Sequence, residues 1–354
     1  MDRRHFSKTA AGVAAAAALL VTAQAHAEVK IIGSGASFPF PIYSAWFQDF
    51  SQKTDGVTVD YQSKGSGAGI QDLINGNVQF AASDAAMNEE EVDQLRKARD
   101  TGAVILPMTA GEIVLAFNLP GIEVVNLPRS VYPEIFAGNV TKWNDPAIAE
   151  ANPDVELPDL AITPIVRSDS SGTTYVFTRH LSAVDPESFP FDTFVSKAPE
   201  WPGSPTAAPK NDGITALLQQ TPGGIGYIEY GYAKLTNTPV AALENAAGEF
   251  VVPTPETGAA TLASAEFPSE VAEGEEWKSL IAWLDDPQGE DVYPIATFTW
   301  MLFYEEQDDE VAAALREVVE YGLTTGQEMA TDLGYIPMPE EVVAKVREEA
   351  QRIQ

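Results

Sequence analysis

Four short segments of the chain combine small hydroxyl residues and glycines with very few charged side chains. Each comes after an apolar run typical of a strand, and the backbone N–H groups at the start of a following helix have no partner inside that helix. Glycine lets the backbone approach a ligand, and serine and threonine add hydroxyl donors, so such segments can surround an anion with few cations. The segments are GSGASFPFP at 33–41, KGSGAG at 64–69, FAASDAAM at 80–87 and VRSDSSGTTYVF at 166–177.

The elements that would position these segments alternate between strands and helices. Short apolar runs bounded by turn residues predict the strands, and apolar residues at helical spacing predict the helices. The alternation predicts an α/β fold with a largely parallel sheet covered by helices, whose ligands lie at the carboxyl ends of the strands. The predicted strands are VKII (29–32), VTVDY (57–61), VQFAA (78–82), AVILPM (103–108) and EIVLAFNL (112–119), and another lies in PIATFTWMLFY (294–304).

The predicted helices each present one apolar face. Asn88 and Glu91 form a capping-box pattern for a helix that carries Val92 and Leu95 and ends near Gly102. The other apolar faces consist of Tyr43, Trp46, Phe47 and Phe50; of Ile70, Leu73 and Ile74; of Val311, Leu315, Val318 and Val319; and of Val342, Val346 and Ile353.

Residues 1–27 have the features of an export signal. Arg3 and Arg4 precede the uncharged run 10–21, which is too short to span a bilayer as a mature helix. The sequence AHA that ends at Ala27 has the small residues that signal peptidase requires. We expect a signal peptide cleaved near Ala27, with export by the twin-arginine or the general secretory route. The chain has no cysteine, so neither a lipid-modified cysteine nor a disulfide is available.

The composition argues against several classes of partner. The formal net charge is -31, and residues 1–27 carry three cations and one anion, so their removal leaves -33. This charge disfavours nucleic acid and anionic membranes. Because 45% of the residues are hydrophobic, we interpret the acids as a solvated coat suited to a salty medium and not as a sign of disorder. The mature region, residues 28–354, is longer than one hydrophobic core usually supports, so we expect two lobes.

The sequence lacks the residues and motifs that common catalytic functions need. Beyond the export signal the chain has one histidine, His180, which shares an apolar helical face and so makes a poor base for a serine hydrolase. No G-x-S-x-G elbow surrounds Ser37, Ser66 or Ser171, and neither GSGASF nor KGSGAG completes a dinucleotide-binding motif. A zinc site needs several Cys or His ligands. We therefore expect no enzyme, no cofactor and no metal.

A purely structural interpretation of each segment stays open. Serine and glycine at a strand-to-helix turn are most often plain helix caps. Arg167 beside Asp169 is more often a structural ion pair than a ligand clamp. Asp84 could simply cap a helix that follows it. Four such segments in one chain are harder to explain in this way than one.

Along almost the whole mature region, the chain resembles the periplasmic phosphate-binding proteins of Pst-type ABC transporters. The order and spacing of FAGNVTKWNDPAI and GTTYVFT carry the resemblance most specifically. It implies a type II periplasmic binding protein fold, in which two α/β lobes joined by two hinge strands close on one anion in the cleft between them. The matching segments are GSGASFPFPIYSAWFQDF, YQSKGSGAGIQDL, FAASDAAM, IFAGNVTKWNDPAIAEANP, VRSDSSGTTYVFTRHL and TPGGIGYIEYGYA.

The resemblance also implies a ligand shell for inorganic phosphate. Asp84 would accept the proton that phosphate still carries near neutral pH, whereas sulfate carries none and would face an unpaired charge. Asp169 would hold the Arg167 guanidinium in place. The family often has threonine where Ser37 stands and glycine where Ser170 stands. The expected donors to phosphate are Ser37, Phe38, Ser66, Arg167, Ser171, Gly172 and Thr173.

The same resemblance implies the organisation and partners of the protein. Residues 28–110 with 294–354 would form lobe I, and residues 111–293 would form lobe II. A soluble periplasmic monomer would deliver phosphate to the membrane subunits of an ABC permease for import. The alternatives are a binding protein for another tetrahedral oxyanion, which loss of Asp84 would have favoured, and a secreted phosphate-ester hydrolase or phosphate-sensing surface protein that reuses the fold.

Overall fold

The computed structural model describes residues 28–268 and 280–354. Within these residues, eight strands form one sheet in the order β2-β1-β3-β11-β4-β8-β6-β7, and three short strands form a second sheet in the order β10-β9-β5. The strands of the large sheet are β1 (Val29–Gly35), β2 (Val57–Ser63), β3 (Phe80–Ser83), β4 (Ala103–Phe117), β6 (Thr163–Arg167), β7 (Thr206–Ala208), β8 (Gly224–Glu229) and β11 (Ala296–Tyr304).

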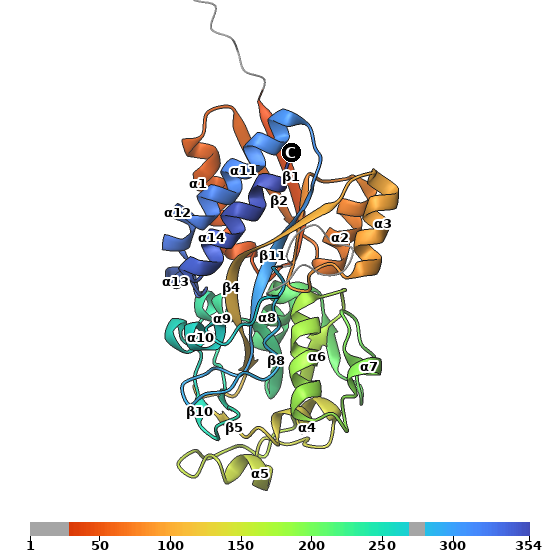
Figure 1. The fold of residues 1–354 in the computed structure, drawn as a ribbon. Helices are drawn as coiled ribbons and strands as arrows, with labels where there is room; N and C mark the ends of the chain where they lie inside the picture. Colours follow the sequence, from red (N-terminus) through yellow and green to blue (C-terminus); the bar gives the residue numbers. More distant parts are fainter. Residues whose placement is uncertain (1–27, 269–279) are drawn as a thin grey trace, which may run out of the picture.

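One long strand, β4, belongs to both ends of this sheet. Residues 103–112 of β4 pair with β11, and residues 113–117 pair with β8. Figure 1 shows β4 and β11 at the middle of the molecule, with helices α1–α3 and α11–α14 above them and α4–α10 below. We call the upper part, with β1–β3 and β11, the first half, and the lower part, with β5–β10, the second half.

The large sheet is mixed, and the expectation of a largely parallel sheet was wrong in its centre. Strand β1 runs parallel to β2 and β3, and β6 runs parallel to β7 and β8. Strand β11, however, runs antiparallel to β3 and β4, and β4 runs antiparallel to β8. The two βαβ regions that the local pattern predicted are present, but long-range antiparallel pairing joins them.

The first two helices fix the positions of two of the four predicted segments. The aromatic face that the sequence predicted for α1 (Phe40–Lys53) is buried. Helix α2 (Ser66–Asn75) packs closely onto β1, since a Cβ atom at Gly69 would lie 2.4 Å from the Cα of Gly35. The two glycines therefore allow the contact that brings Ser66 to the end of the sheet.

The third helix and the strand after it test two further predictions. Helix α3 (Glu89–Arg99) begins with the predicted capping box, in which the Asn88 side chain accepts from the Glu91 N–H and the Glu91 carboxylate accepts from the Asn88 N–H. The two strands predicted at 103–108 and 112–119 are one continuous strand, β4. In the pairing with β11, Thr299 lies opposite Thr109 and Trp300 opposite Pro107, so Met108 is the extra residue of a β-bulge in β4.

The second half contains shorter helices and more loops, as the proline-rich sequence suggests. Its longest helix, α6, begins at Gly172, within the predicted segment 166–177. The small sheet packs at its lower end (Figure 1). The elements are β5 (Asn126–Leu127), β9 (Ala242–Glu244), β10 (Phe250–Val251), α4 (Tyr132–Ala137), α5 (Pro146–Ala149), α6 (Gly172–Val184), α7 (Phe191–Phe194), α8 (Lys210–Gln220), α9 (Tyr230–Thr236) and α10 (Pro255–Leu262).

The chain then returns to the first half through β11 and ends in helices. Helices α11 (Asp309–Leu323) and α14 (Glu340–Glu349) carry the predicted apolar faces, except that Ile353 lies beyond α14, after the short 3₁₀ helix at 350–352. Two short helices between them, α12 (Thr325–Glu328) and α13 (Ala330–Leu333), had no sequence signal. The predicted export signal lies outside the described residues. No helix within 28–268 and 280–354 has the length and apolar character to cross a membrane.

Candidate anion-binding site

The four predicted segments meet at the junction of the two halves, at the carboxyl ends of strands. Segment 64–69 follows β2, and segments 33–41, 80–87 and 166–177 include the carboxyl ends of β1, β3 and β6, the last from the other half. The polar side chains here are shielded from solvent: the residue exposure is at most 1% for Ser37, Ser66, Asp84, Ser171 and Thr173, and the Arg167 side chain is 1% exposed.

The first half contributes two hydroxyls and a carboxylate to the junction. The Ser37 Oγ accepts hydrogen bonds from the backbone N–H and the side-chain amide of Asn211, both at 3.0 Å. The Ser66 Oγ accepts from the Gly172 N–H at 2.9 Å. Both hydroxyls of the first half are therefore bonded to donors of the second half.

Phe38 contributes only its backbone, since its side chain is fully buried in the core. Its carbonyl accepts from the Tyr335 hydroxyl at 2.6 Å, and its ring meets the Tyr335 ring edge to face. These contacts anchor the turn that carries Ser37 to the C-terminal part of the first half.

Asp84 is held by hydroxyl groups from both halves. Its Oδ1 accepts from the Thr299 hydroxyl of β11 at 2.9 Å, and its Oδ2 accepts from the Thr173 hydroxyl of α6 at 3.2 Å. Burial raises the pKa of Asp84 to about 7, although these hydroxyls and the charge of Arg167 act in the opposite direction. Asp84 does not cap a helix, because α3 begins later and takes Asn88 as its cap.

The second half contributes the one guanidinium of the site. Arg167 ends β6 and donates through Nε and Nη2 to the two carboxylate oxygens of Asp169, at 2.8 and 2.5 Å. Its Nη1 reaches the Thr173 hydroxyl at 3.4 Å. Burial alone would raise the pKa of Asp169, but the hydrogen bonds and charge of Arg167 hold it below its ordinary value. Asp169 therefore holds the guanidinium as predicted, while Nη1 faces the junction.

The start of α6 supplies the remaining predicted donors. Ser171 is the N-cap, and its hydroxyl accepts from the Thr174 N–H at 3.0 Å. The Gly172 N–H is directed at Ser66, and a Cβ atom at Gly172 would lie 2.5 Å from the Ser66 Oγ. A side chain at this position would therefore push the two halves apart, so glycine is required here for their contact.

Three residues of the junction were not predicted from the sequence. Asn211, at the start of α8, bonds to Ser37, and Thr299, in β11, bonds to Asp84. The Tyr232 hydroxyl of α9 donates to the Ser37 carbonyl at 2.6 Å. Weak signals existed for two of them: an asparagine at a strand-to-helix turn in APKND, and a threonine within the otherwise apolar run ATFTWMLFY.

His180 does not lie among the polar residues of this junction. It is fully buried, its Nε2 lies 2.8 Å from the Tyr132 hydroxyl, and its Nδ1 lies 2.8 Å from the Asp285 carbonyl. Burial lowers its pKa to about 4. The structure thus places the histidine in the core of the second half, in agreement with its apolar helical face.

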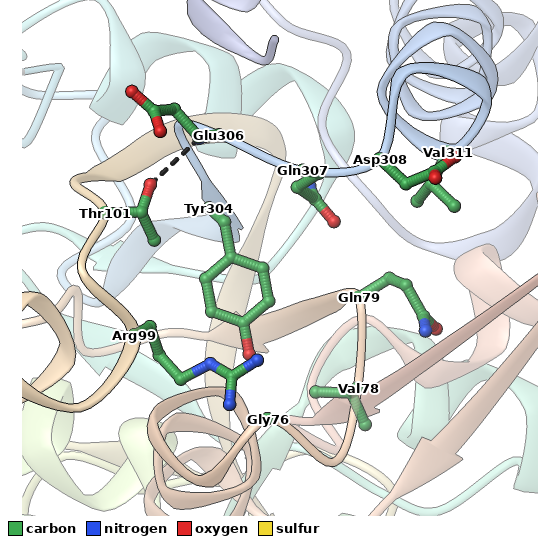
Figure 2. Close-up of a pocket in the computed structure, with 10 residues that line it drawn as sticks. All are labelled: Gly76, Val78, Gln79, Arg99, Thr101, Tyr304, Glu306, Gln307, Asp308 and Val311. Carbon is green, nitrogen blue, oxygen red and sulfur yellow. Dashed lines mark hydrogen bonds between the residues drawn. The ribbon is translucent and has the colours of Figure 1, made fainter.

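A separate pocket of about 230 Å³ lies at the opposite end of the first half (Figure 2). Its Tyr304 ends β11 five residues after Thr299, about 17 Å away along an extended strand. The Arg99 guanidinium lies over the Tyr304 ring at 5.6 Å, and the acids Glu306 and Asp308 also line the pocket. These exposed carboxylates make this pocket less suited to an anion than the buried junction.

Comparison with known proteins defines the class. A family model described as a PBP superfamily domain matches residues 21–324. The structure also resembles a high-affinity periplasmic phosphate-binding protein, PfluDING, solved with bound phosphate: the TM-score is 0.75 at 22% identity, covering 90% of this chain and 93% of that one. A phosphate-binding protein from Stenotrophomonas maltophilia gives a TM-score of 0.71. The chain is a member of the PBP superfamily with the two-lobed α/β fold of periplasmic binding proteins.

Sequence similarity narrows this class to one family. The phosphate-binding protein PstS of Pasteurella multocida is 36% identical over 320 residues, which cover 90% of this chain and 88% of that protein. PstS of Methanocaldococcus jannaschii is 32% identical over 327 residues, covering 87% and 82%. The chain belongs to the PstS family of phosphate-binding proteins, a family of binding proteins and not of enzymes.

Proposed function

We propose that this protein binds inorganic phosphate at the junction of its two halves and delivers it to an ABC permease for import. The observation that carries the proposal is the placement of Asp84, a buried carboxylate with a pKa of about 7, opposite Arg167 and the start of α6. An anion between them would meet a cation, the backbone N–H groups at the start of a helix and an acid that can take up or give back one proton.

The junction has two walls, one formed by the first half and one by the second half, and the proposed donors come from both. Ser37 and Phe38 would donate from the turn after β1, Ser66 from the start of α2, and Arg167 from the end of β6. The Ser171, Gly172 and Thr173 groups would donate from the start of α6. The Gly172 N–H and the Ser66 hydroxyl, which now bond to each other, would then bond to the anion, whereas the contact between Asn211 and Ser37 would remain.

Asp84 would set the choice between phosphate and sulfate. Phosphate near neutral pH carries a proton that a carboxylate can accept, whereas sulfate brings only negative charge to it. A like-charge contact without a bridging proton costs several kcal/mol when it is buried. Because solvent is excluded from Asp84, little screening would reduce that cost.

Entry of the ligand would require the halves to separate. The residues of the junction are at most a few per cent exposed, so an ion cannot reach them while the halves touch. We propose residues 28–110 with 294–354 as lobe I and residues 111–293 as lobe II, because β4 changes its partner from β11 to β8 near residue 112. Bending there and at the start of β11 would open the cleft.

The proposed setting follows from the charge and the amino-terminal sequence. A monomer exported to the periplasm, with its signal peptide cleaved near Ala27, would present both lobes to the membrane permease. A net charge of -33 would not prevent anion binding in a saline medium, because near 1 M salt the Debye length is only about 3 Å. Local donors would then decide the affinity.

Calorimetric titration of the phosphate-stripped protein tests the proposal. We expect one phosphate per chain and at least a hundredfold weaker binding of sulfate. In the Asp84→Asn variant the preference for phosphate over sulfate should shrink at least tenfold, because the amide removes the repelling charge. The matched control is Asp60→Asn, which removes an exposed carboxylate of the same half. Equal heats for the two anions in the wild type would support a binding protein for another tetrahedral oxyanion.

A further inference from the structure

The turn before α8 contacts both walls of the junction at once. Lys210 has a left-handed backbone conformation, with φ of 62°, which directs successive N–H groups to different partners. Its own N–H donates to the Asp169 Oδ1 at 2.9 Å, and the next N–H, that of Asn211, donates to the Ser37 Oγ at 3.0 Å. This turn therefore supports the carboxylate that holds Arg167 and also reaches the hydroxyl of the opposite half.

The orientation of the Asn211 side chain is fixed by its neighbours. The residue is fully buried, and its Oδ1 accepts from the backbone N–H of Glu229 at 3.0 Å. A backbone N–H can only donate, so the amide oxygen must face Glu229 and the amide nitrogen must face the other way. That nitrogen lies 3.0 Å from the Ser37 Oγ.

Ser37 consequently has one hydrogen-bonding option left. A serine hydroxyl can accept two hydrogen bonds and donate one. Both acceptor positions of the Ser37 Oγ are taken by the two N–H groups of Asn211. The hydroxyl proton is then the only hydrogen-bonding capacity left to the Ser37 side chain, and it needs an acceptor.

We propose that Asn211 is a positioning residue that makes the Ser37 hydroxyl a donor-only contact for the bound anion. This inference rests on the proposed function and adds a role for a residue outside the expected ligand shell. A phosphate oxygen that carries the proton cannot accept well and would find no acceptor at Ser37. The protonated oxygen is therefore directed away from Ser37 and toward Asp84, the carboxylate that can accept it.

A double-mutant cycle on phosphate affinity tests this role. We expect Ser37→Ala and Asn211→Ala each to weaken phosphate binding roughly tenfold or more, because each removes the same charge-assisted hydrogen bond to the anion. The double variant should bind no more weakly than Ser37→Ala alone, since Asn211 acts through Ser37. Losses that multiply in the double variant would overturn the inference, because they would show that Asn211 acts independently of the hydroxyl.

A control and a second variant separate positioning from general damage. Asn118→Ala removes another amide that bonds to α8, at the carbonyls of Leu218 and Gln219 near its other end, and should change phosphate affinity less than twofold. If Asn211→Ala does not fold, Asn211→Ser replaces the amide with a neutral hydroxyl and adds no charge beside the anion. It should weaken phosphate binding when Ser37 is present and have little further effect in Ser37→Ala.

The outcomes distinguish this inference from the function on which it rests. A wild-type protein that gives no heat with phosphate would reject the proposed function and this role with it. A wild type that binds phosphate, combined with independent losses in the cycle, would reject the role of Asn211 alone.

Discussion

Two carboxylates face the same guanidinium from opposite walls of the junction, yet burial and bonding move their pKa values in opposite directions. Asp169 makes two hydrogen bonds to Arg167, and its pKa lies below the ordinary value. Asp84 receives hydroxyls from Thr299 and Thr173, and burial raises its pKa to about 7. Both acids lie within reach of Arg167, but only Asp169 bonds to it directly.

The difference shows that partner and burial together decide the state of such an acid, since Asp84 is 1% exposed and the Asp169 side chain is 18% exposed. A guanidinium stabilises the ionised form by charge and by two parallel hydrogen bonds, so Asp169 stays ionised and offsets the charge of Arg167. Hydroxyl groups supply weaker compensation, so Asp84 can carry a proton at neutral pH. One wall thus has a fixed charge pair, and the other has an acid whose proton can be exchanged with a ligand.

The largest expected effect comes from removing the shared cation. Arg167→Gln takes away the guanidinium that the structure places at the junction and leaves the partly buried Asp169 carboxylate without its partner. Phosphate affinity should fall by about 2–5 kcal/mol, roughly 30- to 5,000-fold, as measured by calorimetric titration. Adding Asp169→Asn should restore stability but not affinity. An affinity within threefold of the wild type for Arg167→Gln would show that the helix start alone holds the anion.

The opposite pKa shifts predict opposite dependences of stability on pH. The raised pKa of Asp84 means that its stabilising contribution is present below about pH 4 and is lost as the pH rises through about 7. The lowered pKa of Asp169 means that its contribution is present above about pH 4 and is lost in stronger acid. The two carboxylates should therefore leave separate signatures in one set of denaturation experiments.

Urea denaturation of the phosphate-stripped protein between pH 4 and 8 measures the signature of Asp84, whereas that of Asp169 appears only below about pH 4. The difference in unfolding free energy between wild type and Asp84→Asn should decline with pH by up to about 1.4 kcal/mol per pH unit, the limit for one proton. Glu112, whose pKa burial raises to about 8, adds a slope of the same sign in both proteins and cancels in the difference. A difference that is constant with pH would mean that Asp84 is ionised throughout.

The smallest expected effect lies at the edge of the junction, where an ion pair joins the walls. The Lys197 ammonium contacts the Glu91 carboxylate across the two halves, and both side chains are partly exposed. Lys197→Met should weaken phosphate binding by at most about fivefold, since such pairs contribute about 0–1 kcal/mol. In stopped-flow experiments, Lys197→Met should release phosphate faster than the wild type at low salt. Near 1 M salt the two proteins should release it at the same rate.

The matched control is Lys53→Met, which removes a surface ion pair to Asp49 within the first half. It should leave the release rate unchanged at every salt concentration. A difference between Lys197→Met and wild type that persists near 1 M salt would point to lost packing and not to lost charge.

Much of the candidate site could be predicted because its signals are local. Glycine, serine and a charged residue at a strand-to-helix turn mark Ser37, Ser66, Arg167 and Ser171 within a few positions of sequence. The roles of Asn211 and Thr299 could not be read in this way, because their partners Ser37 and Asp84 are 174 and 215 positions away. Only the assembled sheet brings these pairs together.

The fold shows the same contrast between local features, which could be predicted, and long-range pairings, which could not. Apolar periodicity located β1–β4, β11 and the longer helices of the first half, since burial of one face acts over a few residues. It did not locate β7–β10 or α8 in the second half. It could not reveal that 103–108 and 112–119 form one strand, because the partners of β4 come from 225–229 and 296–304. The antiparallel centre of the sheet is a product of those distant pairings, which have no signature in either strand alone.

The position of β11 also has a consequence for the order of folding. This strand lies between β3 and β4, although it follows β4 by about 180 residues in the chain. During synthesis, the first half therefore keeps two unpaired strand edges until nearly the whole chain has been made, while β8 can already pair with β4. The second half should mature earlier, and the first half should depend longest on chaperones that shield open strands.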